Sequence, residues 1–161
     1  MTAEGLRTDW CGELTLDDDG REVVLCGWVA TRREHGEHLA FVDVRDRTGV
    51  VQCVVPGADE LRSEYVVKVT GTVARRPEGT VNPELGTGEV EVRDCSVEVL
   101  NPADALPFPI SDRIDADESL RLRHRYLDLR RSRLQQNLIQ RAAVNRALRN
   151  AMADQGFTEI E

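Results

Sequence analysis

The sequence of 161 residues lacks any long uncharged apolar run. Its apolar stretches have the length of single strands, such as Val50 to Val55, whereas a membrane-spanning helix needs about 20 mostly apolar residues. The N-terminus carries Glu4, Arg7 and Asp9 where a secretory signal peptide needs an apolar segment. We therefore expect a cytoplasmic protein with no membrane partner.

Short chemical signatures are also missing. The four cysteines form no C-x-x-C pair, and none of the three histidines stands at the spacing of a zinc ligand. Neither G-x-x-x-x-G-K-[ST] nor G-x-G-x-x-G occurs, so no phosphate-binding loop is indicated. The sequence predicts no metal site, no catalytic residue and reduced thiols, which are typical of a reducing compartment.

Lysine is nearly absent, since Lys68 is the only lysine among 21 basic residues. Arginine suits bidentate phosphate contacts, although a GC-rich genome is an alternative explanation. The formal net charge is −8, yet residues 120–161 carry nine basic and four acidic side chains. A polyanion responds to local patches, so the acidic total does not exclude a nucleic-acid partner.

The first hundred residues predict a mainly β structure. Five stretches with strand-like patterns follow one another, separated by turn residues. They are 22–30, 39–46, 50–55, 65–74 and 89–100. Residues 58–64 predict a helical or turn segment after the third strand, and this order is that of an OB-fold, a five-stranded Greek-key barrel. Composition alone leaves an SH3-like barrel as the alternative.

The remaining residues predict a proline-rich hinge followed by helices. Prolines and aspartates alternate over 101–118, which disfavours regular structure. A capping box at Ser132 and Gln135 predicts the start of a long helix, and Gly156 its C-terminal cap. Residues 157–161 predict the start of a strand that has no partner, which indicates part of a larger protein.

Alternation on the second and third strands predicts a surface for single-stranded nucleic acid. If Val42 and Val44 face the core, Phe41 faces outward, as Gln52 does on the next strand. An outward ring beside an amide can stack on a base and read its edge. The alternative is that Phe41 packs under a loop.

Two arginine pairs flank this surface. Arg32 and Arg33 end the first predicted strand, and Arg75 and Arg76 end the fourth. OB-folds bind oligonucleotides across the second and third strands and the adjoining loops. The alternative is that these arginines are ordinary solvated charges.

Several strings resemble the N-terminal part of bacterial-type aspartyl-tRNA synthetases, a family of class II aminoacyl-tRNA synthetases. They are CGWV (26–29), FVDVRDRTGVVQ (41–52), GTV (71–73), TGEVEV (87–92), RYLDLRR (125–131) and QGFTEIE (155–161). The last resembles the opening of class II motif 1. The resemblance implies an anticodon-binding OB-fold domain over 1–100, a hinge linker over 101–118 and the start of a class II α+β catalytic domain over 119–161.

The resemblance also implies roles for individual residues. Phe41 would stack on an anticodon base, Gln52 would hydrogen-bond the central uridine, and Glu91 would help to recognise the first base. The expected anticodon-binding residues are Arg32, Arg33, Phe41, Gln52, Arg75, Arg76, Asn82 and Glu91. His35 and Gly79 match residues of members that charge both tRNA(Asp) and tRNA(Asn), although an extra residue near Glu37 leaves the register of 35–39 open.

The implied parent enzyme is a homodimer that attaches L-aspartate to tRNA through an aspartyl-adenylate made from ATP with Mg²⁺. Motifs 2 and 3 of the class do not occur within residues 1–161, so we expect this chain to bind tRNA, to hold no cofactor and to be inactive as a ligase. The alternatives are a stand-alone OB-fold module for single-stranded nucleic acid and a non-catalytic synthetase paralogue.

Overall fold

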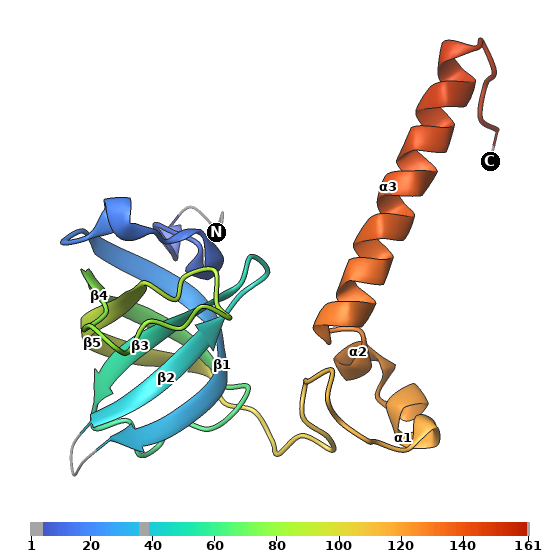
Figure 1. The fold of residues 1–161 in the computed structure, drawn as a ribbon. Coiled ribbons are helices and arrows are strands. Elements are labelled where there is room, and N and C mark those ends of the chain that lie inside the picture. Colours follow the sequence, from blue (N-terminus) through green and yellow to red (C-terminus); the bar gives the residue numbers. More distant parts are fainter. Residues whose placement is uncertain (1–4, 36–38, 161) are drawn as a thin grey trace. The chain divides into compact units, whose positions relative to one another are not determined.

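The computed structural model describes residues 5–35 and 39–160 of a chain that divides into two compact units, 1–105 and 106–161. In the first unit five strands form a closed barrel in the order β1-β2-β3-β5-β4 (Figure 1). The strands are β1 (Glu22–His35), β2 (Leu39–Arg45), β3 (Val50–Pro56), β4 (Val66–Arg75) and β5 (Val90–Asn101). Neighbouring strands are antiparallel except for β3 and β5, which are parallel. The predicted mainly β, OB-type barrel is confirmed.

Small apolar side chains fill the barrel, since β-branched residues pack well on pleated strands. On β2 the side chains of Val42 and Val44 are at most 1% exposed, and on β3 those of Val51 and Cys53 are fully buried. The predicted inward positions are thus confirmed. The residues between them point to the outer face of the barrel.

Two inward-facing glycines allow neighbouring strands to approach closely. A Cβ atom on Gly27 would lie 2.5 Å from the carbonyl oxygen of Arg45, and one on Gly71 would lie 2.6 Å from that of Arg93. A side chain at either position would push backbone away from backbone. The glycines of the strings CGWV and GTV are therefore required for the close packing of neighbouring strands in the barrel.

The N-terminal segment packs on the barrel through two short 3-10 helices that the sequence analysis did not predict, η2 (Cys11–Glu13) and η3 (Leu16–Asp18). Cys11 is fully buried, and its backbone N–H donates to the Asp46 carboxylate at 2.7 Å. Because Asp46 follows β2, this bond ties the N-terminal segment to the turn between β2 and β3.

Residues 58–64 form turns, which agrees with the prediction of a helical or turn segment there. The predicted end of the first strand needs correction. Strand β1 continues past Ala30 to His35, after an irregularity in its pairing between Val29 and Thr31. Such a bulge lets a strand bend and continue along its partner, so Arg32 and Arg33 lie within the strand and not in a loop.

The second unit contains α1 (Glu118–Arg123), α2 (Arg125–Asp128) and α3 (Ser132–Asp154). The predicted capping box of α3 is wrong, because its N-cap is Arg131 and has no side-chain hydrogen bond. The backbone N–H of Arg133 donates instead to the carboxylate of Asp112 at 3.1 Å, from a segment far away in sequence. The expected hinge over 101–118 stays a prediction. Among the described residues no helix is long and apolar enough to cross a membrane.

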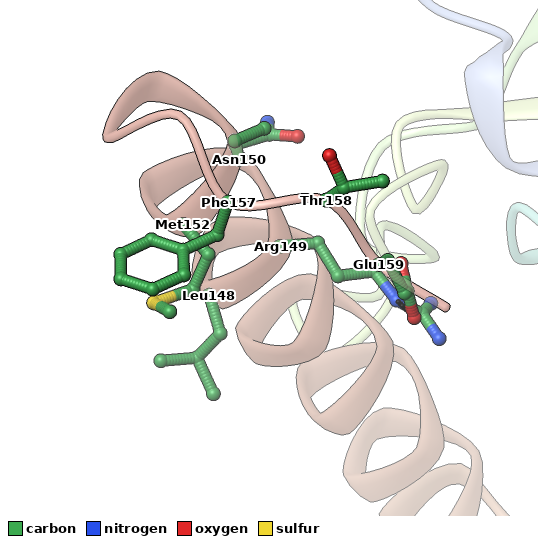
Figure 2. Close-up of a pocket in the computed structure, with 8 residues that line it drawn as sticks. Leu148, Arg149, Asn150, Met152, Phe157, Thr158 and Glu159 are labelled. Atoms are coloured by element: carbon green, nitrogen blue, oxygen red, sulfur yellow. Dashed lines mark hydrogen bonds and ion pairs between the residues drawn. The ribbon is translucent and has the colours of Figure 1, made fainter. Parts of the chain in front are cut away.

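The C-terminal end of α3 follows the predicted glycine cap. Gly156 has a φ of +84°, and the N–H of Phe157 donates to the carbonyl of Met152 at 3.1 Å, which is the Schellman pattern. The chain then turns back along the helix, so that Phe157 lies beside Met152 and Leu148 (Figure 2). The strand predicted to begin at 157 is therefore absent from residues 157–160.

A buried carboxylate organises the RYLDLRR segment. Asp128 is 0% exposed and accepts hydrogen bonds from Arg121 at 3.1 Å, from Arg125 at 2.6 Å and from Arg131 at 3.0 Å. Burial alone would raise the pKa of Asp128, but hydrogen bonds from Arg121 and Arg131 outweigh it and hold the pKa below its ordinary value. The ionised Asp128 therefore stabilises the folded segment above pH about 4, and this stabilisation is lost as the pH falls through the lowered pKa.

We expect Asp128→Asn to loosen residues 118–131, because it leaves three guanidinium groups without their shared anion. A loss of about 1–3 kcal/mol corresponds to roughly 5- to 150-fold faster amide hydrogen exchange in this segment. Asp154→Asn, at an exposed position in the same unit, is the matched control. Equal exchange rates in Asp128→Asn and the wild type would contradict the role given to Asp128.

Candidate nucleic-acid interface

A cavity of about 440 Å³ lies on the outer face of the barrel, between β1, β2, β3 and the segment after β4. Four of the expected site residues line it: Arg33, Gln52, Arg76 and Asn82. We call it the β1–β3 cavity. Its residues come from distant parts of the sequence, so barrel closure brings them together.

The amide of Gln52 is held at both ends. Its Nε2 donates to the Glu91 carboxylate at 2.9 Å, and its Oε1 accepts from the Arg33 guanidinium at 3.3 Å. Gln52 and Glu91 are only 9% and 4% exposed. An amide turned by 180° keeps its shape but exchanges donor and acceptor, and it would then face Arg33 with a donor and Glu91 with an acceptor. The two charged neighbours thus favour one orientation.

Two residues that the sequence analysis left unassigned hold these neighbours. Asp43 accepts from Arg33 at 3.0 Å and from the hydroxyl of Thr31, and Arg93 donates to Glu91 at 2.8 Å. Asp43 lies two residues after Phe41, and Arg93 two residues after Glu91. The period of two that places side chains on one face of a strand was the signal that could have found them.

Arg76 is buried beside the cavity, although arginine is rarely buried without a full set of partners. It is 6% exposed, and its Nε donates to the carbonyl of Val90 at 3.0 Å. Its Nη1 donates to the carbonyl of Thr80 at 3.4 Å, whereas its Nη2 is buried and has no partner among the described residues. An unsatisfied buried donor costs about 1–3 kcal/mol, so the site carries a cationic group with unused hydrogen-bonding capacity.

Asn82 belongs to a tight loop between β4 and β5. Its N–H donates to the carbonyl of Gly88 at 3.1 Å, and its Oδ1 accepts from the N–H of Glu84 at 3.0 Å. A Cβ atom on Gly88 would lie 1.8 Å from the carbonyl oxygen of Asn82, so only glycine fits there. Gly88, in the string TGEVEV, thereby fixes the place of Asn82.

Phe41 is half-buried on the outer face of β2, where its neighbours in register are Arg33 of β1 and Val54 of β3. Arg32 lies on the other face of β1 from Arg33, because it pairs with the inward-facing Val42. Its guanidinium bonds to Glu34 at 3.0 Å and to Asp59 at 3.2 Å. The structure therefore does not bring Arg32 to the β1–β3 cavity.

The remaining expected residues lie outside the lining of the cavity. Arg75 is exposed at the end of β4. Gly79 has a φ of +82°, and a Cβ atom there would have nothing within 4 Å. The backbone of His35 pairs with Leu39. The side chain of His35, like Glu37 and the rest of 36–38, lies outside the described part of the chain.

Two family models match the chain. Residues 23–100 match the OB-fold nucleic acid binding domain, and residues 117–161 match the tRNA synthetases class II (D, K and N). A curated relative from Moorella thermoacetica, named aspartate–tRNA(Asp/Asn) ligase, is 51% identical over 173 residues, which cover 100% of this chain and 29% of the relative. A relative of the same name from Nocardioides sp. is 51% identical over 159 residues, with 97% and 27% covered. The chain thus spans less than a third of these relatives.

Solved structures agree on the fold. An asparaginyl-tRNA synthetase from Pyrococcus horikoshii, complexed with asparaginyl-adenylate, superposes with a TM-score of 0.79 at 27% identity, over 95% of this chain and 36% of that one. An aspartyl tRNA synthetase from Entamoeba histolytica gives 0.86 at 19% identity, over 99% and 40%. The chain belongs to the class II aminoacyl-tRNA synthetases of the D, K and N group, as a segment that joins an OB-fold nucleic-acid-binding domain to the start of the synthetase domain.

Proposed function

We propose that the barrel binds the anticodon of tRNA and that the chain is the N-terminal part of an aspartate–tRNA ligase. The observation that carries this proposal is the β1–β3 cavity, which combines an oriented amide with arginine donors. Base edges are read by placed donors and acceptors, and phosphates are bound by cations. The relatives named aspartate–tRNA(Asp/Asn) ligase support the choice of tRNA.

Gln52 reads the central base, which is uridine in the anticodons for both aspartate and asparagine. One lone pair of Oε1 and one N–H of Nε2 remain for the base after the bonds to Arg33 and Glu91. Uracil presents N3–H as donor and O4 as acceptor, whereas cytosine presents the reverse at the same ring positions. A held amide therefore discriminates between the two pyrimidines, and a free amide does not.

Phe41 provides the stacking surface beside this amide, and Arg33 and Arg76 the cationic groups. Base–aromatic stacking contributes about 1–3 kcal/mol and tolerates every base. Phe41 therefore supports affinity, while Gln52 supports selectivity. Arg75 is an exposed phosphate contact at the edge of this surface, and Arg32 acts only indirectly, through the segment 57–64.

The protein accepts both tRNA(Asp) and tRNA(Asn), whose anticodons differ at the third base. Gly79 leaves open space in the loop after β4, where a larger side chain could press on one of the two bases. The names of the relatives are consistent with this dual choice.

The longer protein attaches L-aspartate to tRNA through an aspartyl-adenylate, with ATP and Mg²⁺. The described residues contain no group of three or more His, Cys, Asp or Glu side chains that could hold a metal ion. We assign no step of adenylate formation to residues of this chain. The match of 117–161 to the synthetase family favours this function over a stand-alone OB-fold module.

A homodimer of the longer protein and a cytoplasmic location complete the proposal. Helix α3 exposes Leu138, Val144, Leu148 and Met152 by 46–60%, and an apolar surface of this kind suits an interface between subunits.

Phe41→Ala should weaken binding of an anticodon stem-loop by about 1–3 kcal/mol, because it removes one base–aromatic stack. Fluorescence anisotropy of a labelled stem-loop measures the change. Val99→Ala, which shortens a half-exposed valine on β5, is the control and should leave binding as it is. Unchanged affinity of Phe41→Ala would show that Phe41 does not stack on RNA.

Glu91→Gln should reduce the preference for uridine over cytidine at the central position, because a glutamine at 91 can face either end of the Gln52 amide. We expect a wild-type preference of about 1–3 kcal/mol and a markedly smaller one in the variant. Glu89→Gln, at an exposed neighbouring position, should keep the wild-type ratio. The idea of a held amide fails if Glu91→Gln keeps that ratio as well.

Two stem-loops that differ only in the last anticodon base test the choice of tRNA. The wild type should bind them about equally, and His35→Leu should favour the aspartate sequence because it removes a planar polar ring. A wild-type preference of more than tenfold, or about 1.4 kcal/mol, would argue against dual recognition.

A further inference from the structure

Both tryptophans of the chain line a second cavity on the barrel. It holds about 260 Å³ and lies between the N-terminal segment, β1 and the turn between β2 and β3. Trp10, Trp28, Arg7 and Arg47 form its aromatic and basic parts. None of these residues belongs to the expected anticodon-binding set.

The guanidinium groups of Arg7 and Arg47 lie against the ring of Trp10. The guanidinium carbons of Arg7 and Arg47 lie 3.9 Å and 5.1 Å from the centroid of Trp10, within the range of cation–π contacts. Among the described residues no ion pair is formed by Arg7 or Arg47. Four other arginines of the barrel unit do have carboxylate partners: Arg21, Arg33, Arg45 and Arg93.

The nearby Asp46 forms no ion pair with Arg7 or Arg47 in the described part of the chain, because its carboxylate is engaged by other donors, although its charge offsets one of the two guanidinium charges. Its carboxylate accepts from the N–H groups of Cys11 at 2.7 Å, of Thr48 at 2.8 Å and of Gly49 at 3.3 Å. It also accepts from the Thr48 hydroxyl at 2.7 Å. The lining of the cavity thus carries two guanidinium groups and one carboxylate, on a barrel that is otherwise rich in acidic residues.

The second cavity continues the outer face that carries the β1–β3 cavity. Along β1, Trp28 lines the second cavity, while Thr31 and Arg33 line the first. Val29, between them, points into the core. Three residues of extended strand, from Trp28 to Thr31, span about 10 Å, so one RNA strand can reach both cavities.

We propose that Arg7, Trp10 and Arg47 form a second RNA contact, which binds the sugar–phosphate backbone of the tRNA strand next to the anticodon. Guanidinium groups bind phosphate oxygens in bidentate fashion and offer a planar surface for stacking. The tryptophan orders both guanidinium groups before RNA arrives, which limits the entropy lost on binding. This proposal rests on the proposed function, because the anticodon must occupy the β1–β3 cavity.

Tryptophan fluorescence of the 161-residue chain reports on this cavity alone, because both tryptophans lie in it. An anticodon stem-loop should change the fluorescence along the same curve as the anisotropy of a labelled stem-loop. Gln52→Ala should require more RNA but reach the same change at saturation, because it leaves the second cavity intact.

The double variant Arg7→Gln/Arg47→Gln should bind the stem-loop roughly tenfold more weakly, which corresponds to about 1.4 kcal/mol. The slope of log affinity against log salt should fall by about 0.7 for each lost phosphate contact. Arg62→Gln, at an exposed arginine in the turns after β3, removes one charge as a control and should keep the wild-type slope.

The outcomes separate the two proposals. If the wild type does not bind the stem-loop, the proposed function is wrong and this contact falls with it. If the stem-loop binds but the double variant keeps the wild-type affinity and salt slope, this inference alone is overturned. An unchanged tryptophan signal at saturating RNA overturns it in the same way.

Discussion

The parallel pairing of β3 with β5 closes the barrel, and the geometry of the β1–β3 cavity depends on it. Cys53 stands opposite Val92, so the preceding residues, Gln52 and Glu91, meet on the outer face. The two residues are 39 positions apart in sequence. A barrel that stayed open between β3 and β5 would keep Arg33 on β1 and Phe41 on β2 but lose Glu91, the partner that orients the amide.

Acidic and basic side chains alternate in the hydrogen-bonded series on the outer face of the barrel. Asp43, Arg33, the Gln52 amide, Glu91 and Arg93 form one hydrogen-bonded series across four strands. Arg33 is 56% exposed in its side chain, and exposed ion pairs contribute little to stability. Its bond to Asp43 can therefore be exchanged for a phosphate at small cost, while the buried bond between Gln52 and Glu91 persists.

Much of the barrel could be predicted from the sequence because strand alternation is a local signal. The five strands, the inward valines and the outward positions of Phe41 and Gln52 all follow from a period of two. The contacts that the sequence did not predict depend on partners that are distant in sequence. The carboxylate of Asp112 accepts from the first turn of α3, and the carboxylate of Glu91 accepts from the amide of Gln52 on another strand. The tryptophan cavity escaped notice because Trp10 precedes the first strand and only the folded N-terminal segment brings it to Trp28.

The glycine at position 71 links the backbone of the barrel to the orientation of the Gln52 amide. Gly71 lies on β4, and the carbonyl that excludes a side chain there belongs to Arg93 of β5, the residue that bonds to Glu91. A methyl group at 71 would displace this stretch of β5 and, with it, the carboxylate that orients Gln52. Under the proposed function, variants at this glycine would alter the choice of tRNA although the residue faces the core of the barrel.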